Sequence, residues 1–343
     1  MLKQSSDDLE EKLFDVVNNL NQGSALITDK SELIILVGLN LQAGSKAKMS
    51  TAYRPAINYF NTGLELLGND ADWIKNYDLL FNLNRQLAEC EYLCGNFERS
   101  DELFNMLLTK AATKLEKAEI YYMKVIQYEN MALYKKSIQS VNEGLKMFGI
   151  ELPVNKTDVD YAFKSEVELI NRNLNPGNIQ DLSGLPVMKD ADVKMSMKLL
   201  MSLWAPAYIA AEVGLTRWLS AKMVNLSFTY GNTEESAVAY AIYGLTLGIE
   251  FADYKSGYDY GLMAISVNEK FKDVKYKAKV HHIFSCHINF WTKPIASCYP
   301  HSRQAYQSGL ENGDFVYAAY AMIHESWNAF LSGHELNQFI KDY

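Results

Sequence analysis

The chain has 343 residues, of which 48% are hydrophobic and 22% are charged, a mixture typical of a globular protein. Its formal net charge of −8 argues against nucleic-acid binding, which usually requires a basic excess. No apolar run approaches the roughly 20 residues that cross a bilayer, so membrane insertion is not expected either.

The N-terminal stretch predicts a helix and no secretion signal. Residues 1–17 are acidic and amphipathic and lack the apolar core of a signal peptide. Four cysteines without such a signal are typical of reduced thiols, which predicts a cytoplasmic protein. Apolar residues recur at helical spacing from Leu9 and Leu13 to Leu20, and they predict a first helix over 8–20.

Two amphipathic segments follow, and small residues mark the place where their helices are expected to cross. The first begins at Asp29 or Ser31, either of which can cap a helix, and runs towards Gly44. The second covers 51–67. In an alignment to the tetratricopeptide pattern, Gly44 takes the small position of the first helix. The small, large and small positions of the second helix are Ala56, Phe60 and Gly63.

The same frame fits two further helical hairpins. The clearest covers 82–108, with a tight turn at Gly95-Asn96 between its helices, and a third unit covers 118–150. Their residues in register are Ala88, Ser100, Phe104 and Leu107 in the second hairpin, and Tyr134, Ser137, Val141 and Gly144 in the third. A hairpin this small cannot bury its apolar stripe alone. The repeats therefore predict an all-α, tetratricopeptide-like superhelix, a right-handed solenoid of helical hairpins.

Three segments are predicted along the chain. Residues 1–152 form an N-terminal tetratricopeptide-like block, 153–191 a helix plus an extended connecting segment, and 192–343 an irregular C-terminal block of the same kind. The connecting segment contains Asn175-Pro176-Gly177 and is either a hinge or a buried loop. In the C-terminal block, Pro206 is expected to bend or split a helix. Later helices are predicted over 236–251, 254–271, 274–291 and 294–311, and from Gly313 to Phe330. The missing polar cap at the end predicts a truncated chain.

Ordered segments of the sequence resemble one bacterial family. They include LPVMKDADVKMSMKLL, APAYIAAEVGL, AKMVNLSFTYGNTEESAVAYAIYG and FADYKSGYDYGLMAISVNEKF, preceded by AGSKAKMSTAYRPAINYF and AECEYLCGNFERSDEL and followed by SGLENGDFVYAAYA. From about residue 15 onward the chain is similar to the helical region of large multi-domain signalling proteins. In those proteins a serine/threonine kinase-like module and an AAA, STAND-like ATPase precede this region, and GAF and histidine-kinase modules follow it.

The resemblance implies a non-catalytic scaffold or sensor arm of a bacterial signal-transduction ATPase or kinase. Such an arm makes protein–protein or interdomain contacts. The kinase and nucleotide-binding motifs of the family lie outside this chain, so no enzyme activity is carried over to it.

A direct search for chemistry in the residues leads to the same expectation. The nearest approach to a phosphate loop, 38–46, has the wrong spacing and follows no strand. His282 and Cys286 lie four residues apart, with further histidines nearby, but no CxxC or HExxH element accompanies them. Packed side chains are the preferred interpretation there and for Cys90 and Cys94. No catalytic residue, metal site or cofactor is predicted.

A binding groove is predicted on the first helix of each hairpin, where tetratricopeptide units usually present a concave surface. The predicted groove residues are Lys48, Asn82, Arg85, Glu89, Tyr92, Glu119, Tyr122, Glu129 and Asn130. This mix of charge, amide and aromatic ring suits a peptide or a helix from a partner protein or from a neighbouring domain of the same polypeptide. The alternative is that these residues only solvate the inner face or lie under the second block.

A second functional hypothesis is a small-molecule effector sensor. Aromatic residues of the C-terminal block would then enclose the effector, around Trp204, Tyr208, Trp218, Tyr240 and Tyr243. The interaction arm predicts an open groove with polar walls, whereas the sensor predicts a closed apolar pocket with a few polar groups.

Overall fold

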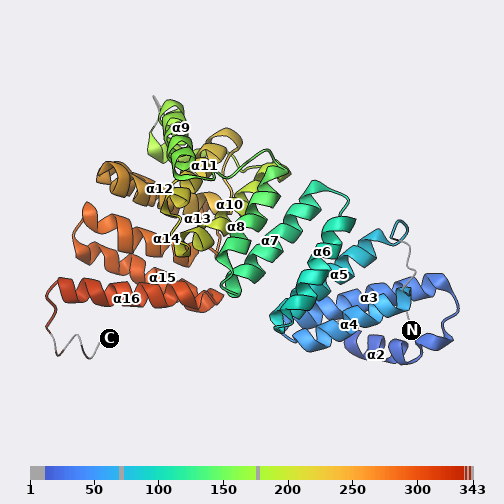
Figure 1. Ribbon diagram of the computed structural model, residues 1–343. Helices are drawn as coiled ribbons and strands as arrows, with labels where there is room; N and C mark the ends of the chain where they lie inside the picture. The colour runs from blue at the N-terminus through green and yellow to red at the C-terminus, as the bar shows by residue number, and fades with distance from the viewer. Residues whose placement is uncertain (1–11, 69–72, 175–177, 336, 338–339, 341–343) are drawn as a thin grey trace. The chain divides into compact units, whose positions relative to one another are not determined.

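A computed structural model describes residues 12–68, 73–174, 178–335, 337 and 340, and this part of the chain is built of helices (Figure 1). The all-α prediction is confirmed: the described residues form 15 α-helices and no strand beyond an isolated bridge between Val187 and Asn232. None of the described helices combines the length and the hydropathy needed to cross a bilayer. Leu9 and the predicted break at 175–177 lie outside the described residues.

Contacts group the chain into two compact units, Met1–Leu133 and Tyr134–Tyr343, and each is described by itself. The last predicted repeat contributes residues to both of these units, because its second helix begins at Tyr134. The predicted division into 1–152, 153–191 and 192–343 stays a prediction.

The first unit is made of helical hairpins. Its elements are α2 (Leu13–Gln22), a 3₁₀ turn η1 (Ser24–Leu26), α3 (Lys30–Met49), α4 (Tyr53–Leu67), α5 (Tyr77–Leu93), α6 (Phe97–Lys110) and α7 (Lys114–Asn130). Helices α3 and α4 pair, as do α5 and α6, while α2 packs on α3 and α7 packs on α5 and α6. The side chain of Asp29 caps α3, with its Oδ1 2.7 Å from the Ser31 amide nitrogen, so the first of the two predicted capping residues is the one used.

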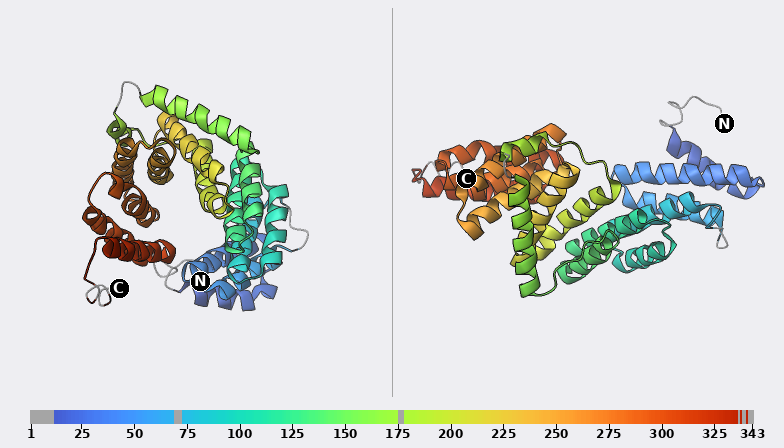
Figure 2. Two further views of the ribbon diagram at one scale, coloured as in Figure 1. Left: turned by 60° about the vertical axis from the view of Figure 1, so that its left-hand side comes forward. Right: turned by 90° about the horizontal axis from the view of Figure 1, so that it is seen from above.

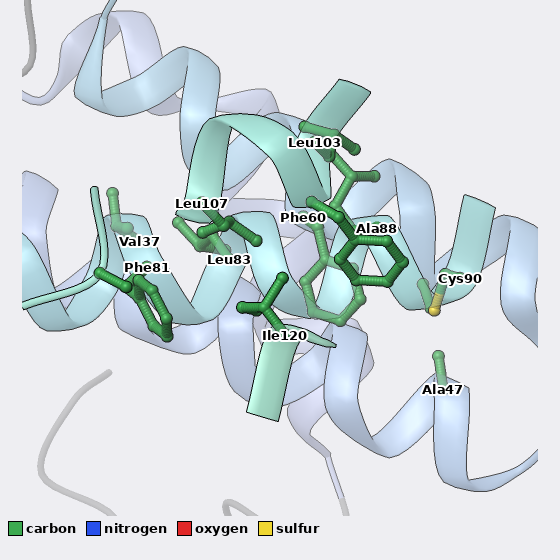
Figure 3. Close-up of a cluster of buried hydrophobic side chains, with 14 residues drawn as sticks. Val37, Ala47, Phe60, Phe81, Leu83, Ala88, Cys90, Leu103, Leu107 and Ile120 are labelled. Carbon is green, nitrogen blue, oxygen red and sulfur yellow. The ribbon is translucent and has the colours of Figure 1, made fainter. Parts of the chain in front are cut away.

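Small and large residues meet in the core of this unit at the predicted positions. Ala56, Phe60, Ala88 and Leu107 are all at most 1% exposed. A Cβ atom on Gly44 would lie only 2.4 Å from Cε1 of Phe60, so the missing side chain makes room for the ring. Figure 3 shows side chains from α4, α5, α6 and α7 meeting in this cluster. One continuous core therefore holds the two hairpins and α7 together.

The second unit contains the remaining helices. They are α8 (Tyr134–Lys146), α9 (Lys156–Leu174), α10 (Ala191–Ile209), α11 (Val213–Tyr230), α12 (Glu234–Phe251), α13 (Tyr254–Phe271), α14 (Lys277–Ile283), α15 (Tyr299–Asn312) and α16 (Phe315–Leu331). Helix α8 packs on α10 and α9 packs on α11, so partners here are not always neighbours in sequence. Helices α12 and α13 form a close hairpin, and α15 and α16 lie side by side (Figures 1 and 2).

The connecting segment before α10 is packed against the unit rather than extended into solvent. It contains the 3₁₀ turn η2 (Ile179–Gly184), which contacts α13, and Leu182 and Met188 are at most 3% exposed. Asn232 fixes this segment, because its backbone pairs with Pro186 O at 2.8 Å and with Met188 N at 2.9 Å. The Asn232 side-chain amide also donates to Leu182 O at 2.8 Å. The connecting segment was predicted to be either a hinge or a buried loop, and these contacts are those of a buried loop.

Two helix predictions in this unit require correction. The helix predicted over 274–291 is interrupted, because α14 gives way to a π-helical turn η3 (Phe284–Ile288) and a 3₁₀ turn η4 (Asn289–Trp291). The helix predicted over 294–311 begins only at Tyr299, after the 3₁₀ turn η5 (Ile295–Cys298). Pro206 does not split α10, since it lies in the last turn, where a proline disturbs little of the remaining helix.

Candidate functional site

The predicted groove residues lie in the first unit, on α3, α5 and α7. Asn82, Arg85, Glu89 and Tyr92 follow one another at spacings of three and four residues, which places them on one face of α5. Helix α5 contacts both α3 and α7, so this face has a neighbour on either side. The three helices bring the predicted residues together in a band that we call the polar strip: Lys48, Asn82, Arg85, Glu89, Tyr92, Glu119, Tyr122, Glu129 and Asn130.

Lys48 joins α3 to α5. Its Nζ donates to Gln86 Oε1 at 2.8 Å and forms an ion pair with Glu89, and the Lys48 side chain is 20% exposed. Gln86 was not predicted as a groove residue, and its role depends on how α3 approaches α5. The ion pair leaves the Glu89 side chain 36% exposed, so the carboxylate can still meet a partner.

Arg85 joins α5 to α7. Its Nη1 donates to Glu119 Oε1 at 2.9 Å, and its Nη2 donates to Asn82 Oδ1 at 3.1 Å. The Nε atom of Arg85 is buried and has no hydrogen-bond partner among the described residues. Glu119 is 41% exposed, so this link also ends in an accessible carboxylate.

Tyr92 and Asn130 close the strip at the far end of α5 and α7. The Asn130 side-chain amide donates to the Tyr92 hydroxyl. Burial raises the pKa of Tyr92 above its ordinary value, the Asn130 bond opposes that rise, and the nearby carboxylates of Glu129 and Glu89 add to it. The phenol is therefore neutral at physiological pH and serves as a hydrogen-bonding group. Tyr122 and Glu129 lie on α7 in the same strip and are partly buried.

A second polar cluster in this unit was missed by the sequence analysis. Lys124 on α7 is only 7% exposed and pairs with Asp101 on α6, and its Nζ also lies 2.9 Å from Asn105 Oδ1. The Tyr128 hydroxyl donates to Asp101 Oδ1 at 2.7 Å. Burial acts to raise the pKa of Asp101, but the bonds from Lys124 and Tyr128 outweigh it and the pKa is lowered. A lysine in a helical stripe carries no sequence signal of such burial.

The ion pairs described for the polar strip are contacts between helices. Its cross-helix pairs, Lys48 with Glu89 and Arg85 with Glu119, hold three helices in register. The Glu89 and Glu119 side chains are 36% and 41% exposed. The binding groove stays a prediction.

The five aromatic residues of the sensor hypothesis lie in the second unit, but they do not enclose one pocket. Tyr240, Tyr243 and Trp218 are core residues with at most 4% exposure. Trp204 stacks on Tyr208 with ring centroids 5.4 Å apart, and Tyr208 is 62% exposed. Among the described residues, none of the five lines the pocket that contains Gly244 and Trp291 or the one that contains Arg217.

A pocket of the second unit has a volume of about 750 Å³, and Arg217 of α11 is one of its lining residues. Arg217 Nη2 donates to Asp160 Oδ1 at 3.0 Å, and Nη1 pairs with Glu250. The Nε of Arg217 is buried without a hydrogen-bond partner in the part of the chain that the structure describes. The guanidinium also lies over the ring of Phe163, 5.3 Å from its centroid.

Comparison with known proteins links the chain to a signalling protein. The chain is 28% identical over 355 aligned positions to hybrid signal transduction histidine kinase G of Dictyostelium discoideum. The similarity covers 95% of this chain but only 10% of that protein, so the chain spans about a tenth of the length of the curated relative that it matches. No family model matches the sequence. The predicted bacterial source and ATPase association stay predictions.

Proposed function

We propose that this chain is a non-catalytic, tetratricopeptide-like arm of a signal-transduction protein, and that it holds a partner protein or a neighbouring domain against the polar strip. The observation that carries the proposal is the continuity of the strip over α3, α5 and α7, with half-exposed carboxylates at Glu89 and Glu119. The similarity to a histidine kinase over 95% of the chain supports a role in signalling. The proposed setting is a cytoplasmic multi-domain polypeptide.

The repeat character of the arm is supported by its helix crossings. Gly44 faces Phe60, and a Cβ on Gly63 would lie 3.0 Å from a methyl group of Leu83. In the third predicted hairpin, Ser137 and Val141 are fully buried. Small residues of this kind let neighbouring helices approach closely, as tetratricopeptide repeats require.

Photo-crosslinking from the strip tests this function. A benzoylphenylalanine placed at Tyr122 in the intact signalling polypeptide should crosslink, in cells, to one defined segment of a partner or of the same polypeptide. The same probe at Tyr161, which is 75% exposed in the second unit, serves as the control. The Arg85→Ala variant should reduce the Tyr122 product and leave the Tyr161 background unchanged. Equal, diffuse crosslinking from both positions would contradict the proposal.

Effector sensing is the second candidate, and the pocket around Arg217 favours it. Its volume of about 750 Å³ falls within the range of ligand pockets, about 300–1,000 Å³. The lining carries three cations, Lys135, Lys156 and Arg217, and three carboxylates, Asp160, Glu212 and Glu250, so a metabolite with groups of both charges is the class that the site would take. Thermal-shift screening of metabolites should then find a zwitterion that stabilises the wild type but not Arg217→Met. A screen without any such metabolite would remove this candidate.

A further inference from the structure

A cluster of imidazole and thiol groups lies in the second unit and shares no residue with the pocket lined by Arg217. The candidate ligand atoms of His282, Cys286 and His324 all lie within 4.8 Å of one another. His282 belongs to α14 and Cys286 to the π-helical turn η3, whereas His324 comes from α16. Two segments far apart in the sequence, 282–286 and α16, thus converge on one point with three groups that bind soft metal ions.

The spacing of the first two groups is that of ligands on one ion. Cys286 Sγ lies 3.4 Å from His282 Nδ1. Zinc–sulfur and zinc–nitrogen bonds of about 2.3 and 2.0 Å in a tetrahedral site put such atoms about 3.5 Å apart. The π-helical turn is what presents Cys286 here, and π-turns occur frequently at functional sites. A thiol–imidazole hydrogen bond explains this one contact, but it does not explain a third nitrogen that arrives from another helix.

His324 is oriented as a metal ligand usually is. Its Nδ1 lies 2.9 Å from the backbone oxygen of Tyr320. A carbonyl oxygen can only accept, so Nδ1 carries the proton and the neutral ring keeps its lone pair on Nε2. Metal-ligating histidines characteristically donate their second ring nitrogen to a carbonyl or carboxylate in this way.

The two ligands of the first segment are buried, with His282 4% and Cys286 6% exposed. A bound divalent cation deprotonates a coordinating thiol, so binding would release one proton.

We propose that His282, Cys286 and His324 form a binding site for a zinc-type transition-metal ion. His287 lies beside the three ligands, with its ring edge-on to those of His282 and His324 at centroid distances of 5.5 and 5.4 Å, but it is outside the group whose ligand atoms lie within 4.8 Å of one another. The ion ties α16 to α14. This link matters because the buried residues of α16 are three alanines, Ala318, Ala321 and Ala329, whereas Phe315 and Trp327 are 65% and 59% exposed.

Metal titration of the full chain tests the site. The chain is reduced and stripped with a chelator, and Zn²⁺ is then titrated by calorimetry, with Co²⁺ as a spectroscopic probe of thiolate coordination. We expect one equivalent of Zn²⁺ and a Co²⁺ spectrum with a thiolate charge-transfer band. Cys286→Ser and His324→Gln should each weaken Zn²⁺ binding by at least about 100-fold, because each removes a direct ligand. Cys286→Ser should also abolish the charge-transfer band.

His301→Asn is the matched control. His301 packs beside His281, with the two Nδ1 atoms 3.2 Å apart, and it is not one of the three ligands. Its variant should bind Zn²⁺ as the wild type does, and circular dichroism verifies that every variant is folded. Hydrogen exchange in α16 should slow on Zn²⁺ addition in the wild type but not in Cys286→Ser. Absence of saturable binding, or equal binding by Cys286→Ser and the wild type, would overturn the proposal.

Discussion

At the scale of single residues, two glycines of α3 show what the helix crossing demands. Gly44 faces Phe60 so closely that a Cβ atom would lie 2.4 Å from the ring, whereas a Cβ on Gly38 would meet nothing within 4 Å. Both residues belong to one helix, and the backbone conformation of that helix is suitable for alanine at each. The difference between them is therefore a difference in packing.

This difference predicts opposite effects of one substitution. Gly38→Ala should raise the free energy of unfolding by about 0.5–1 kcal/mol, because alanine loses less backbone entropy than glycine in a helix. Gly44→Ala should lower it by about 1–3 kcal/mol, because the added methyl group overpacks the site of Phe60. Urea unfolding followed by circular dichroism measures both. Equal stabilisation by the two variants would mean that the ring of Phe60 does not lie against Gly44.

The lowered pKa of Asp101 predicts that the free energy of unfolding depends on pH. Its folded-state pKa lies below the ordinary value of 3.8, because the bonds from Lys124 and Tyr128 outweigh the effect of burial. The stabilisation by the Asp101 carboxylate is therefore complete at a pH above the pKa of Asp101 in the unfolded chain. It is lost as the pH falls through the lower pKa of Asp101 in the folded chain. Asp101→Asn should cost about 2 kcal/mol of unfolding free energy at pH 7, since it removes hydrogen bonds to a charged group.

The control for this prediction is the same comparison of wild type and Asp101→Asn at low pH. The difference in unfolding free energy between wild type and Asp101→Asn should begin to shrink as the pH falls below about 4, where the unfolded chain takes up the proton, and should go on shrinking until the folded carboxyl group is protonated as well. Urea unfolding at pH 7 and at about pH 2.5 gives the two differences. A difference that is the same at both pH values would show that the charge of Asp101 does not stabilise the fold.

At the scale of elements, Asn232 connects the segment before α10 to the start of α12. Its side chain donates to Leu182 O at 2.8 Å and accepts from the Tyr240 hydroxyl at 2.7 Å, and Asn232 has no exposed surface. The preceding Gly231 has φ +96°, and a Cβ there would lie 2.2 Å from Pro186 O. The close approach of the two segments thus depends on a glycine and an asparagine in succession.

Replacement of Asn232 by alanine should destabilise the second unit by about 2–4 kcal/mol. The variant leaves the buried Tyr240 hydroxyl without a partner, which costs about 1–3 kcal/mol. It also removes one of two hydrogen bonds to Leu182 O, which still accepts from Leu185 N at 3.2 Å. Tyr240→Phe alone should cost less, and in the double variant the two losses should fall short of their sum, because the orphaned hydroxyl is removed. Unfolding free energies of the two single variants and the double variant check this, and strict additivity would contradict it.

The helices could be predicted from the sequence where local signals agree. Predicted bounds of 254–271 match α13, Tyr254–Phe271, because apolar periodicity and a capping Asp253 act within the segment itself. The turn η3 was missed because no local pattern distinguishes a π-helical turn from an α-helix. The packing of η2 on α13 was also missed, since contacts such as Lys270 Nζ to Ser183 O join residues far apart in sequence.

The candidate site shows the same limit. The alignment to the tetratricopeptide pattern predicted Arg85, Glu89 and Tyr92 as groove residues, and in the structure Arg85 and Tyr92 bond to α7 and Glu89 pairs with α3. The individual side-chain pairings could not be predicted from the sequence, because the bond from Lys48 to Glu89 depends on how α3 and α5 approach each other. The convergence of His324 with His282 and Cys286 was missed for the same reason: His324 lies on a helix outside the histidine run.

At the scale of the whole molecule, the two compact units should unfold separately. Tryptophan can distinguish them, because four of the five tryptophans, Trp204, Trp218, Trp291 and Trp327, belong to Tyr134–Tyr343. In a Trp73→Phe background, the fluorescence therefore reports on the second unit alone, while far-UV circular dichroism reports on the helices of both. Separate contact groups of this kind commonly open at different free energies.

One destabilising substitution in each unit tests this independence. Phe60→Ala should cost about 3–5 kcal/mol, because Phe60 is fully buried in the first unit. In the Trp73→Phe background, Phe60→Ala should lower the urea midpoint of the first unit, which is followed by circular dichroism. It should leave the urea midpoint of the second unit, which is followed by fluorescence, unchanged. Asn232→Ala should shift the fluorescence midpoint instead. If each variant shifted both signals equally, the units would unfold as one cooperative block, and a signal received by one unit would be transmitted to the other as a change in stability.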